Sequence, residues 1–311
     1  MKKMLSTREI AEYLGVNEKM VYSLVSGKGL PASKITGKWV FPLHLVDEWI
    51  EANTLNYPSR SPDKVAAQPR VIVLAGSNDI LLEKAIGIFN RSCRDYLAVF
   101  ANLGSMGGLR ALRRNMCHIA SSHLLQENGA DYNFEFANRE FNQVPVIVNF
   151  CRREQGFLLQ KGNPVNIRSI ADLRKPGLRM VNRSMGTGTR HLFDREAKKA
   201  GINPEAIAGY HTEAGSHLEV GLEILSGRAD IGLGIRTVAG LLGLDFIPLR
   251  WERYDLMIVK DRFFDKSIQF FLGLLQEAAF KEIAGKLEGY DISGAGRIIF
   301  PQDAEEKTSS S

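Results

Sequence analysis

One segment of the chain, residues 181–196, combines residue types and spacing that could bind an anion. It reads VNRSMGTGTRHLFDRE, a predicted strand followed by a Gly- and Thr-rich turn and an amphipathic helix. The N–H groups at a helix N-terminus and the positive end of its dipole attract anions, and a guanidinium adds charge-assisted hydrogen bonds. The segment lacks the G-x-x-x-x-G-K-[ST] of a P-loop and does not complete G-x-G-x-x-G. We predict an anion site made of Arg183, Ser184, Thr187, Gly188 and Thr189.

Serines follow several other predicted strands or begin the helices after them. They stand in AGSND, LGSMGG, ASSHLL and AGSHLEV. A lone serine in such a place is typical of a helix cap or a turn. In open α/β sheets, however, ligands bind beyond the carboxyl ends of the strands, so several serines at corresponding ends favour one shared pocket. We therefore add Ser77, Ser105, Ser122 and Ser216 to the predicted ligand-binding residues.

Two further groups of residues have the composition of a metal or a catalytic site but lack the geometry or the motif of one. Cys117, His118 and His123 lie on or beside one predicted strand, where adjacent side chains face opposite ways, so a shared metal site is not expected. His211, Glu213 and His217 cluster near a helix start without any nucleophile-and-base signature. We expect His217 to be a first-turn helix residue at the cleft edge, and we predict no catalytic residue, metal or cofactor.

The elements that must position the anion site alternate between strands and helices. Strands are expected at 70–77, 97–105, 117–125, 144–150, 156–162, 178–184, 229–235 and 252–258. Helices are expected at 81–92, from 107, at 167–173, 189–201 and 216–228, with a closing helix or helix pair at 267–289. Two consecutive sets of α/β alternation predict a domain with two lobes.

A linker separates this region from a smaller module. Residues 56–68 read NYPSRSPDKVAAQ, rich in Pro and Ser and without an apolar period. We therefore place a first domain at 1–56, a linker at 57–69 and a second domain at 70–311. Its first lobe spans about 70–160 and 255–311, and its second about 161–254. The 311 residues are ample for this division.

The first module has the order helix, turn, helix, hairpin, helix. Ser6 or Thr7 can cap a helix that Gly15 ends, and a second helix follows from Glu18 to Ser26, with Met20, Val21 and Leu24 packing inward. KITGKWVFP then gives a hairpin before a helix at 43–51. This order predicts a small α+β winged helix-turn-helix module.

Composition and charge are those of an ordinary globular protein. The chain is 44% hydrophobic and 24% charged, with 40 Lys plus Arg against 35 Asp plus Glu, a formal net charge of +5. Residues 1–64 hold nine basic and seven acidic side chains, yet residues 19–45 contain four lysines and no acid. Three widely spaced cysteines, no secretory signal and no long apolar stretch predict a cytoplasmic protein without a membrane partner.

The first module resembles the excisionase and MerR-like DNA-binding family, in which A-x-Y-L-G-V precedes a G-K-W-x-F wing. The resemblance implies that the helix from Glu18 enters the major groove of double-stranded DNA and that three lysines of the turn and wing contact the backbone. A three-helix protein-interaction module with solvated lysines is the alternative. The implied DNA-binding residues are Asn17, Lys19, Met20, Tyr22, Ser23, Lys28, Lys34 and Lys38.

From about residue 70 onward, the chain resembles the type 2 periplasmic-binding-protein fold, in the branch that binds molybdate, tungstate or phosphate. NRSMGTGTR is similar to the R-S-D-G-S-G-T loop of phosphate binders and the R-x-D-x-S-G-T-H loop of tungstate binders. The order of QGFLLQKGNPVNIRSIADL, SGRADIGLGI and ERYDLMI strengthens the resemblance, which implies a two-lobed α/β domain. Met185 stands where those families place aspartate, which makes fully ionised oxyanions more favourable than hydrogen phosphate and leaves room for an organic acid.

A binding-protein domain beside a DNA-binding module predicts an intracellular sensor. We expect a one-component transcriptional regulator in which the lobes close on a small anion and change the arrangement of two DNA-binding modules. A homodimer is expected because one small module rarely makes enough contacts for a specific site. The alternatives are a sensor of an organic metabolite or cofactor precursor, and an enzyme acting on an anionic substrate.

Overall fold

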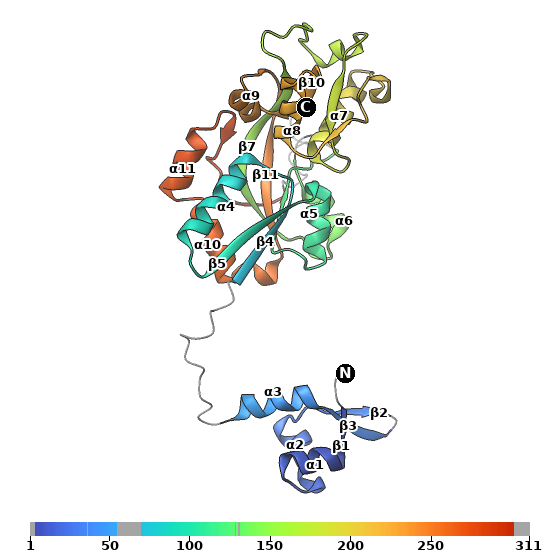
Figure 1. Ribbon diagram of the computed structural model, residues 1–311, viewed down its shortest axis with the longest axis vertical. Helices are drawn as coiled ribbons and strands as arrows, with labels where there is room; N and C mark the ends of the chain where they lie inside the picture. The colour runs from blue at the N-terminus through green and yellow to red at the C-terminus, as the bar shows by residue number, and fades with distance from the viewer. Residues whose placement is uncertain (1–3, 36, 55–69, 128, 130, 302–311) are drawn as a thin grey trace, which may run out of the picture. The chain divides into compact units, whose positions relative to one another are not determined.

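The protein is seen here as a computed structural model that describes residues 4–35, 37–54, 70–127, 129 and 131–301 (Figure 1). The chain divides into two compact units, Met1–Gln68 and Pro69–Ser311. Each unit has hydrophobic clusters of its own.

The first unit packs three helices against a small antiparallel sheet. Its helices are α1 (Thr7–Leu14), α2 (Glu18–Lys28) and α3 (Leu43–Asn53), and its sheet has the order β1 (Met4–Ser6), β3 (Lys38–Pro42), β2 (Ser33–Ile35). Ser6 and Glu9 form a capping box at the start of α1, and Gly15 ends that helix. The winged helix-turn-helix order is confirmed, with β1 as an unexpected third strand.

The core of the first unit corrects one expectation about α2. Ile10, Val21 and Phe41 are fully buried, and Leu24 packs partly against them. Met20, which the pattern placed inside with Val21, is instead 48% exposed. Val21 and Leu24 already fill the inner face of this short helix, and the preceding position is turned away from that face.

The second unit is built on one mixed sheet of ten strands. The order along its main path is β5 (Tyr96–Asn102), β4 (Arg70–Gly76), β6 (Ile119–Ser122), β11 (Asp245–Ile258), β7 (Val146–Leu159), β10 (Ile231–Ile235), β8 (Met180–Arg183), β9 (Glu213–Ala214). Two short strands, β12 (Tyr290–Asp291) and β13 (Ile298–Ile299), also pair with β7. The strands β4, β5 and β6 run parallel, as do β8, β9 and β10.

The strands β7 and β11 pass through both lobes as a long antiparallel pair (Figure 1). At one end β11 pairs with β6 of lobe 1, and at the other β7 pairs with β10 of lobe 2. The two strands predicted at 144–150 and 156–162 are therefore wrong as separate elements, because the polar residues 152–155 continue the strand between them. Gly156 allows the close pairing, since a Cβ there would lie 2.1 Å from the Ile247 carbonyl oxygen.

Helices cover the sheet in each lobe. Lobe 1 carries α4 (Ile80–Ser92), α5 (Gly104–Arg113), α6 (Phe134–Glu140), α10 (Lys266–Leu274) and α11 (Ala278–Gly285). Lobe 2 carries α7 (Gly188–Lys199), α8 (His217–Leu225) and α9 (Arg236–Leu242), with single turns at η1 (Ile170–Arg174) and η2 (Pro204–Ala206), while η3 (Lys260–Arg262) follows β11. The predicted helices are present, and α6 and α9 were not expected.

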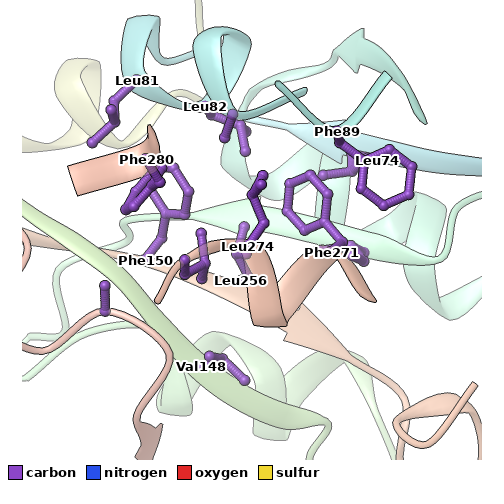
Figure 2. Packing of buried hydrophobic residues seen from close by; sticks show 14 of the residues in the cluster. Leu74, Leu81, Leu82, Phe89, Val148, Phe150, Leu256, Phe271, Leu274 and Phe280 are labelled. Atoms are coloured by element: carbon purple, nitrogen blue, oxygen red, sulfur yellow. The ribbon is translucent and has the colours of Figure 1, made fainter. Parts of the chain in front are cut away.

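The largest core cluster joins the first and last parts of lobe 1. In Figure 2, Leu82 and Phe89 of α4 face Phe271 of α10 and Phe280 of α11. Phe150 of the long strand β7 packs against Phe280, with ring centroids 5.6 Å apart. In the described part of the chain, no helix is long and apolar enough to cross a membrane.

Candidate ligand-binding site and nucleic-acid interface

Buried polar side chains gather where the two lobes meet the long strands. Lobe 1 contributes residues at the ends of β4 and β6, the strands β7 and β11 contribute their middle residues, and lobe 2 contributes the end of β8 and the starts of α7 and α8. Every member of this interlobe cluster is at most 5% exposed. Its members are Ser77, Asp79, Ser105, His123, Arg153, Gln155, Arg183, Thr187, Thr189, His217 and Glu252.

A hydrogen-bonded chain runs from Ser77 through His123 to Glu252. The Ser77 hydroxyl lies 2.9 Å from His123 Nε2, and His123 Nδ1 lies 2.9 Å from a Glu252 carboxylate oxygen. Burial alone would raise the pKa of Glu252, but the adjacent His123 and Arg153 outweigh it and hold the pKa at about 2. Burial lowers the pKa of His123, and Glu252 only partly opposes this effect. At neutral pH the lowered pKa leaves His123 neutral, and Glu252 is kept ionised by the charge of Arg153 and by hydrogen bonds from Arg153, Gln155 and His123.

Arg153 holds the two buried carboxylates of the cluster. Its Nη1 donates to Asp79 and its Nε to Glu252, each at 2.6 Å. Gln155, two residues along the same strand, donates to Glu252 at 2.7 Å and to the Thr189 hydroxyl at 2.9 Å. Alternation along β7 directs residues 153 and 155 to one face of the sheet. The carboxylates of Asp79 and Glu252 are thus already paired with the Arg153 cation at the lobe junction.

Among the described residues, no carboxylate forms an ion pair with Arg183, and only the negative charge of the exposed Glu219 acts on it from farther away. Arg183 ends β8 and is 1% exposed, and its Nη1 donates to the Ala214 carbonyl oxygen at 2.6 Å. Burial lowers the pKa of Arg183 to about 10, and the charge of Arg153 acts in the same direction. A buried cation is costly unless an anion pairs with it. This guanidinium would be stabilised by a negatively charged ligand.

The start of α7 lies against lobe 1. The Thr187 hydroxyl caps the helix by accepting from the Arg190 N–H, and α7 begins at Gly188. A Cβ at Gly188 would lie 2.6 Å from the His123 ring, so glycine is required for this approach. The lobes also meet where the Asn102 side chain donates to the Gly215 carbonyl oxygen at 2.8 Å. The helix terminus predicted to bind an anion therefore faces the Ser77–His123 pair.

His217 is the second buried imidazole of the cluster. It is the first residue of α8, is 1% exposed, and has no hydrogen-bond partner on either ring nitrogen among the described residues. Burial, followed by the charges of Arg183 and Arg153, lowers its pKa well below the ordinary value. The prediction that His217 begins a helix is confirmed, but its side chain is buried and does not lie at the cleft edge.

Other polar atoms of the same cluster also lack partners. They are Arg183 Nε, Arg153 Nη2 and Gln155 Oε1, each buried and without a hydrogen bond to a described residue. Buried polar groups without partners are rare in folded proteins, and each needs an explanation. Since most of these groups are donors and two belong to cationic side chains, a small anion between the lobes would satisfy the donors, though not the Gln155 oxygen.

The structure brings together most of the predicted ligand-binding residues. Ser77, Ser105, Arg183, Thr187, Gly188 and Thr189 all belong to the interlobe cluster or contact it, and the Ser105 hydroxyl accepts from the His123 N–H at 3.3 Å. Ser184 and Ser216 lie beside it, where Ser216 caps α8. The structure places Ser122 elsewhere, because its hydroxyl donates to Asn133, which in turn contacts Asp255.

Sequence reasoning missed Asp79, His123, Arg153, Gln155 and Glu252 as members of the site. Arg153 and Gln155 fell in the gap between two predicted strands. The signal that could have found them is the polar run RREQ between two apolar stretches. A strand whose apolar residues are interrupted by charged ones indicates that its middle part lies in a buried polar site. In the sequence, His123 stands out only through its proximity to Cys117 and His118.

Cys117, His118 and His123 each have different neighbours in the structure. Cys117 is buried, and burial raises the pKa of its thiol to about 12, so it is protonated. His118 Nδ1 accepts from the Val73 N–H, whereas His123 bonds to Ser77 and Glu252. Within the described residues, no group of three His, Cys, Asp or Glu side chains is placed to hold a metal ion.

The helix α2 presents the predicted DNA-reading residues on its outer surface. Met20 is 48% and Tyr22 45% exposed, and Lys19, Ser23 and Lys28 are exposed beside them. Asn17 caps α2 by accepting from the Met20 N–H at 2.9 Å. On the hairpin, Lys34 and Lys38 are exposed, and Lys34 lies over the Trp39 ring. An exposed helix next to a lysine-bearing wing has the form of a major-groove reader.

Comparison with known families identifies both units. The sequence model of the PBP superfamily domain matches residues 87–276, and that of a helix-turn-helix domain matches residues 4–54. The chain therefore belongs to the periplasmic-binding-protein superfamily and carries an excisionase-like helix-turn-helix domain at its N-terminus. This combination fits a ligand-binding, DNA-binding regulator.

Two relatives share parts of this organisation. The uncharacterized protein YvgK of Bacillus subtilis is 27% identical over 307 residues, which cover 94% of this chain and 96% of the relative. A Clostridium pasteurianum protein, described as an uncharacterized protein in the 5' region of a 2Fe-2S ferredoxin gene, is 34% identical over 109 residues. They cover 35% of this chain and 96% of that protein.

Solved structures support the fold of the second unit. A putative phosphate ABC transporter substrate-binding protein from Clostridium perfringens, with bound phosphate, has a TM-score of 0.55 at 13% identity, covering 75% of this chain and 100% of its own. The regulatory domain of MetR, a LysR family regulator from N. meningitidis, has 0.52 at 10% identity, with coverages of 74% and 99%. A tungstate ABC transporter structure from Geobacter sulfurreducens has 0.50 at 13%, with coverages of 70% and 98%.

Proposed function

We propose that the protein is a ligand-responsive transcriptional regulator that senses a small anion between its two lobes, with a tetrahedral oxyanion such as molybdate or tungstate as the preferred class. The observation that carries the proposal is Arg183, a buried cation with which no carboxylate of the described residues forms an ion pair, at the start of the Gly- and Thr-rich turn. Ser77, Ser105, Gly188 and Thr189 would complete the site. Thr187, whose hydroxyl donates to the Ser184 carbonyl oxygen, Ser184 and Ser216 are more distant candidates.

The chemistry of the unpartnered atoms favours a fully ionised anion. Arg153, Arg183 and His217 offer donors, whereas the carboxylates of Asp79 and Glu252 are turned to Arg153. A carboxylate that faces the ligand would select a protonated anion, and Met185, which replaces it in the turn, is 70% exposed. A solved neighbour with bound phosphate and one from a tungstate ABC transporter have the same fold, which is consistent with this ligand class.

DNA binding is assigned to α2 and the hairpin, with Asn17, Lys19, Met20, Tyr22, Ser23, Lys28, Lys34 and Lys38 as the contacting residues. We propose that a homodimer in the cytoplasm reads two half-sites, because a single small module makes few base contacts. Anion binding would alter the arrangement of the lobes, and hence of the two modules, to the extent that the anion prefers one arrangement.

The decisive experiment combines anion binding with DNA binding. Thermal unfolding with molybdate, tungstate, sulfate or phosphate should show stabilisation of about 2.7 kcal/mol at 100 times Kd. A mobility shift on the DNA upstream of the gene should then change when that anion is added. In Arg183→Ala, the stabilisation and the response should disappear while DNA affinity is kept.

Arg179→Ala provides the matched control. Arg179 lies in the same lobe, but it is exposed and paired with Asp230, so its removal should leave both responses intact. Absence of DNA binding in every condition would contradict the regulator proposal. An unchanged thermal shift in Arg183→Ala would place the anion site elsewhere.

An organic acid is the second candidate ligand, and a cavity favours it. A space of about 170 Å³ next to the anion turn is lined in part by Met106, Phe136, Met185 and Arg190. Its mixed walls could hold the apolar part of a metabolite whose carboxylate reaches Arg183. The same thermal measurement with a panel of organic acids separates this ligand class from the inorganic oxyanions.

An enzymatic role has one structural argument in its favour. Ser77, His123 and Glu252 have the order of a nucleophile, a base and an orienting carboxylate. However, Ser77 is 1% exposed, and its backbone N–H donates to the Ser121 carbonyl oxygen, so that N–H is not free to stabilise an oxyanion. Covalent labelling of Ser77 by a fluorophosphonate would favour the enzymatic role over the binding role.

A further inference from the structure

The direction of the hydrogen bonds in the Ser77–His123–Glu252 chain is fixed by chemistry. An ionised carboxylate can only accept hydrogen bonds, so the Nδ1 of His123, 2.9 Å from Glu252, carries the imidazole proton. The Nε2 of the neutral ring is then an acceptor. The Ser77 hydroxyl, 2.9 Å from Nε2, must therefore donate its proton to His123.

This direction conflicts with the proposed role of Ser77 as an anion ligand. A hydroxyl has one proton to donate, and here that proton is used by His123. The oxygen of Ser77 would present only lone pairs to an entering oxyanion, which repels them. Ser77 can donate to the anion only if His123 Nε2 carries a proton of its own.

Building on the proposed anion-binding function, we propose that each bound anion is accompanied by one proton, which His123 takes up at Nε2. The proton comes from solvent. His123 then donates from both ring nitrogens, to Glu252 and to the Ser77 oxygen, and the Ser77 hydroxyl turns its proton to the anion. No other bond is formed or broken.

The charges around His123 favour this uptake once an anion has entered. Glu252 of β11, Arg153 of β7 and Arg183 of β8 act on its charge, with His217 of α8 nearby. Tyr254 stacks on the ring and Gly188 of α7 lies against it, while the Ser105 hydroxyl of α5 accepts from the backbone N–H of His123. The buried ionised groups are two cations, Arg153 and Arg183, and two carboxylates, Glu252 and Asp79, the latter also bound to Arg153. Their charges cancel, so a bound dianion would leave two negative charges in excess. A cationic His123 reduces this excess to one.

His217 is the competing proton acceptor, and the structure separates the two. His217 lacks partners on both ring nitrogens and has no carboxylate bonded to it among the described residues. His123 has Glu252 behind it to stabilise the cationic ring. The imidazolium is therefore better stabilised at His123, and His217 can meet the anion as a neutral N–H donor.

The test is isothermal titration of the full-length protein with molybdate, whose charge does not change near neutral pH. Runs at about pH 8 in two buffers of different ionisation enthalpy give the number of protons taken up. We expect about one proton per molybdate, and a Kd that rises about tenfold per pH unit above the pKa of His123 in the unliganded protein. Tungstate and sulfate serve as further probes.

Three variants locate the proton. His123→Gln should bind without proton uptake and with a Kd that is nearly independent of pH, whereas His217→Asn should keep an uptake of about one. His211→Asn, an exposed histidine of lobe 2, should behave as the unmodified protein does. Uptake that is lost in His217→Asn and kept in His123→Gln would overturn the proposal.

Nitrogen-15 NMR of histidine-labelled protein covers the case in which His123→Gln does not fold. In both the unmodified protein and His217→Asn, one imidazole should become cationic when molybdate is added at about pH 8. Tight molybdate binding with no change of any imidazole would overturn the proton uptake alone. Failure of all three oxyanions to bind would instead contradict the proposed function as well.

Discussion

At the scale of single residues, unpartnered polar groups of the interlobe cluster lower the free energy of unfolding of the unliganded protein and are available to a ligand. His217 is fully buried with both ring nitrogens unpartnered among the described residues, which costs about 1–3 kcal/mol. We predict that His217→Leu raises the free energy of unfolding of the unliganded protein and weakens anion binding at least about tenfold. Chemical denaturation and calorimetric titration measure the two effects.

The exposed His211 of the same lobe is the control, since His211→Leu should change neither quantity by more than about 0.5 kcal/mol. A His217→Leu protein that is less stable and binds the anion as before would contradict the prediction. Such a result would mean that His217 only fills space.

The same residue gives a pH dependence with a definite sign. The folded-state pKa of His217 is lowered from 6.5, mainly by burial, so below about pH 6.5 the unfolded chain binds more protons than the folded one. Stability should therefore fall as the pH drops from about 6.5 to 5, and the fall should be smaller in His217→Leu. Denaturation midpoints across this range test it, and parallel curves would contradict it.

The structure brings together the predicted residues whose signal was local, and their role in binding a ligand stays a prediction. Arg183 and the Gly- and Thr-rich turn lie in one continuous motif, and the structure places them at the lobe junction. Arg153 and Glu252 are 99 residues apart in sequence, and His123 and Glu252 are 129 apart. No local pattern relates such residues, because their pairing depends on how β7 and β11 cross the molecule.

At the scale of elements, the paired strands β7 and β11 tolerate no extra side chain at their closest approach. A Cβ at Gly156 would lie 2.1 Å from the Ile247 carbonyl oxygen and 2.6 Å from the Phe246 ring. Gly156→Ala must push the strands apart, and we predict a loss of about 1–3 kcal/mol in the free energy of unfolding. Thermal or chemical denaturation measures it.

Gly273 of α10 provides the matched comparison in the same unit. A Cβ there has no atom within 4 Å, so Gly273→Ala should be stabilising by about 0.5–1 kcal/mol through helix propensity alone. Equal effects of the two substitutions would show that strand approach is not what selects glycine at position 156.

Element-level prediction succeeded for segments with a strong apolar period and clear ends. α7 and α8 begin within a residue or so of the expected positions because Thr187 and Ser216 cap them. β7 was divided in two because its charged middle does not look like a buried strand. The buried charge of Arg153 is tolerated there because it forms ion pairs with Asp79 and Glu252 at the lobe junction.

At the scale of the whole molecule, the proposed reading of two half-sites would need two copies of the helix-turn-helix unit. We predict that the protein is a dimer at micromolar concentration, measurable by light scattering after size exclusion. If two half-sites are read on one face of DNA, as we propose, inserting about five base pairs between them should abolish binding, whereas about ten should restore it. A monomer that binds its operator tightly would contradict this.

The core of lobe 1 has a consequence for how the protein is synthesised. α4 from the beginning of the second unit packs against α10 and α11 from its end, so this core cannot form until the last helices leave the ribosome. The helix-turn-helix unit, complete by Asn53, can fold much earlier. A nascent or truncated chain would thus hold a finished DNA-binding unit before it has any means of responding to a ligand.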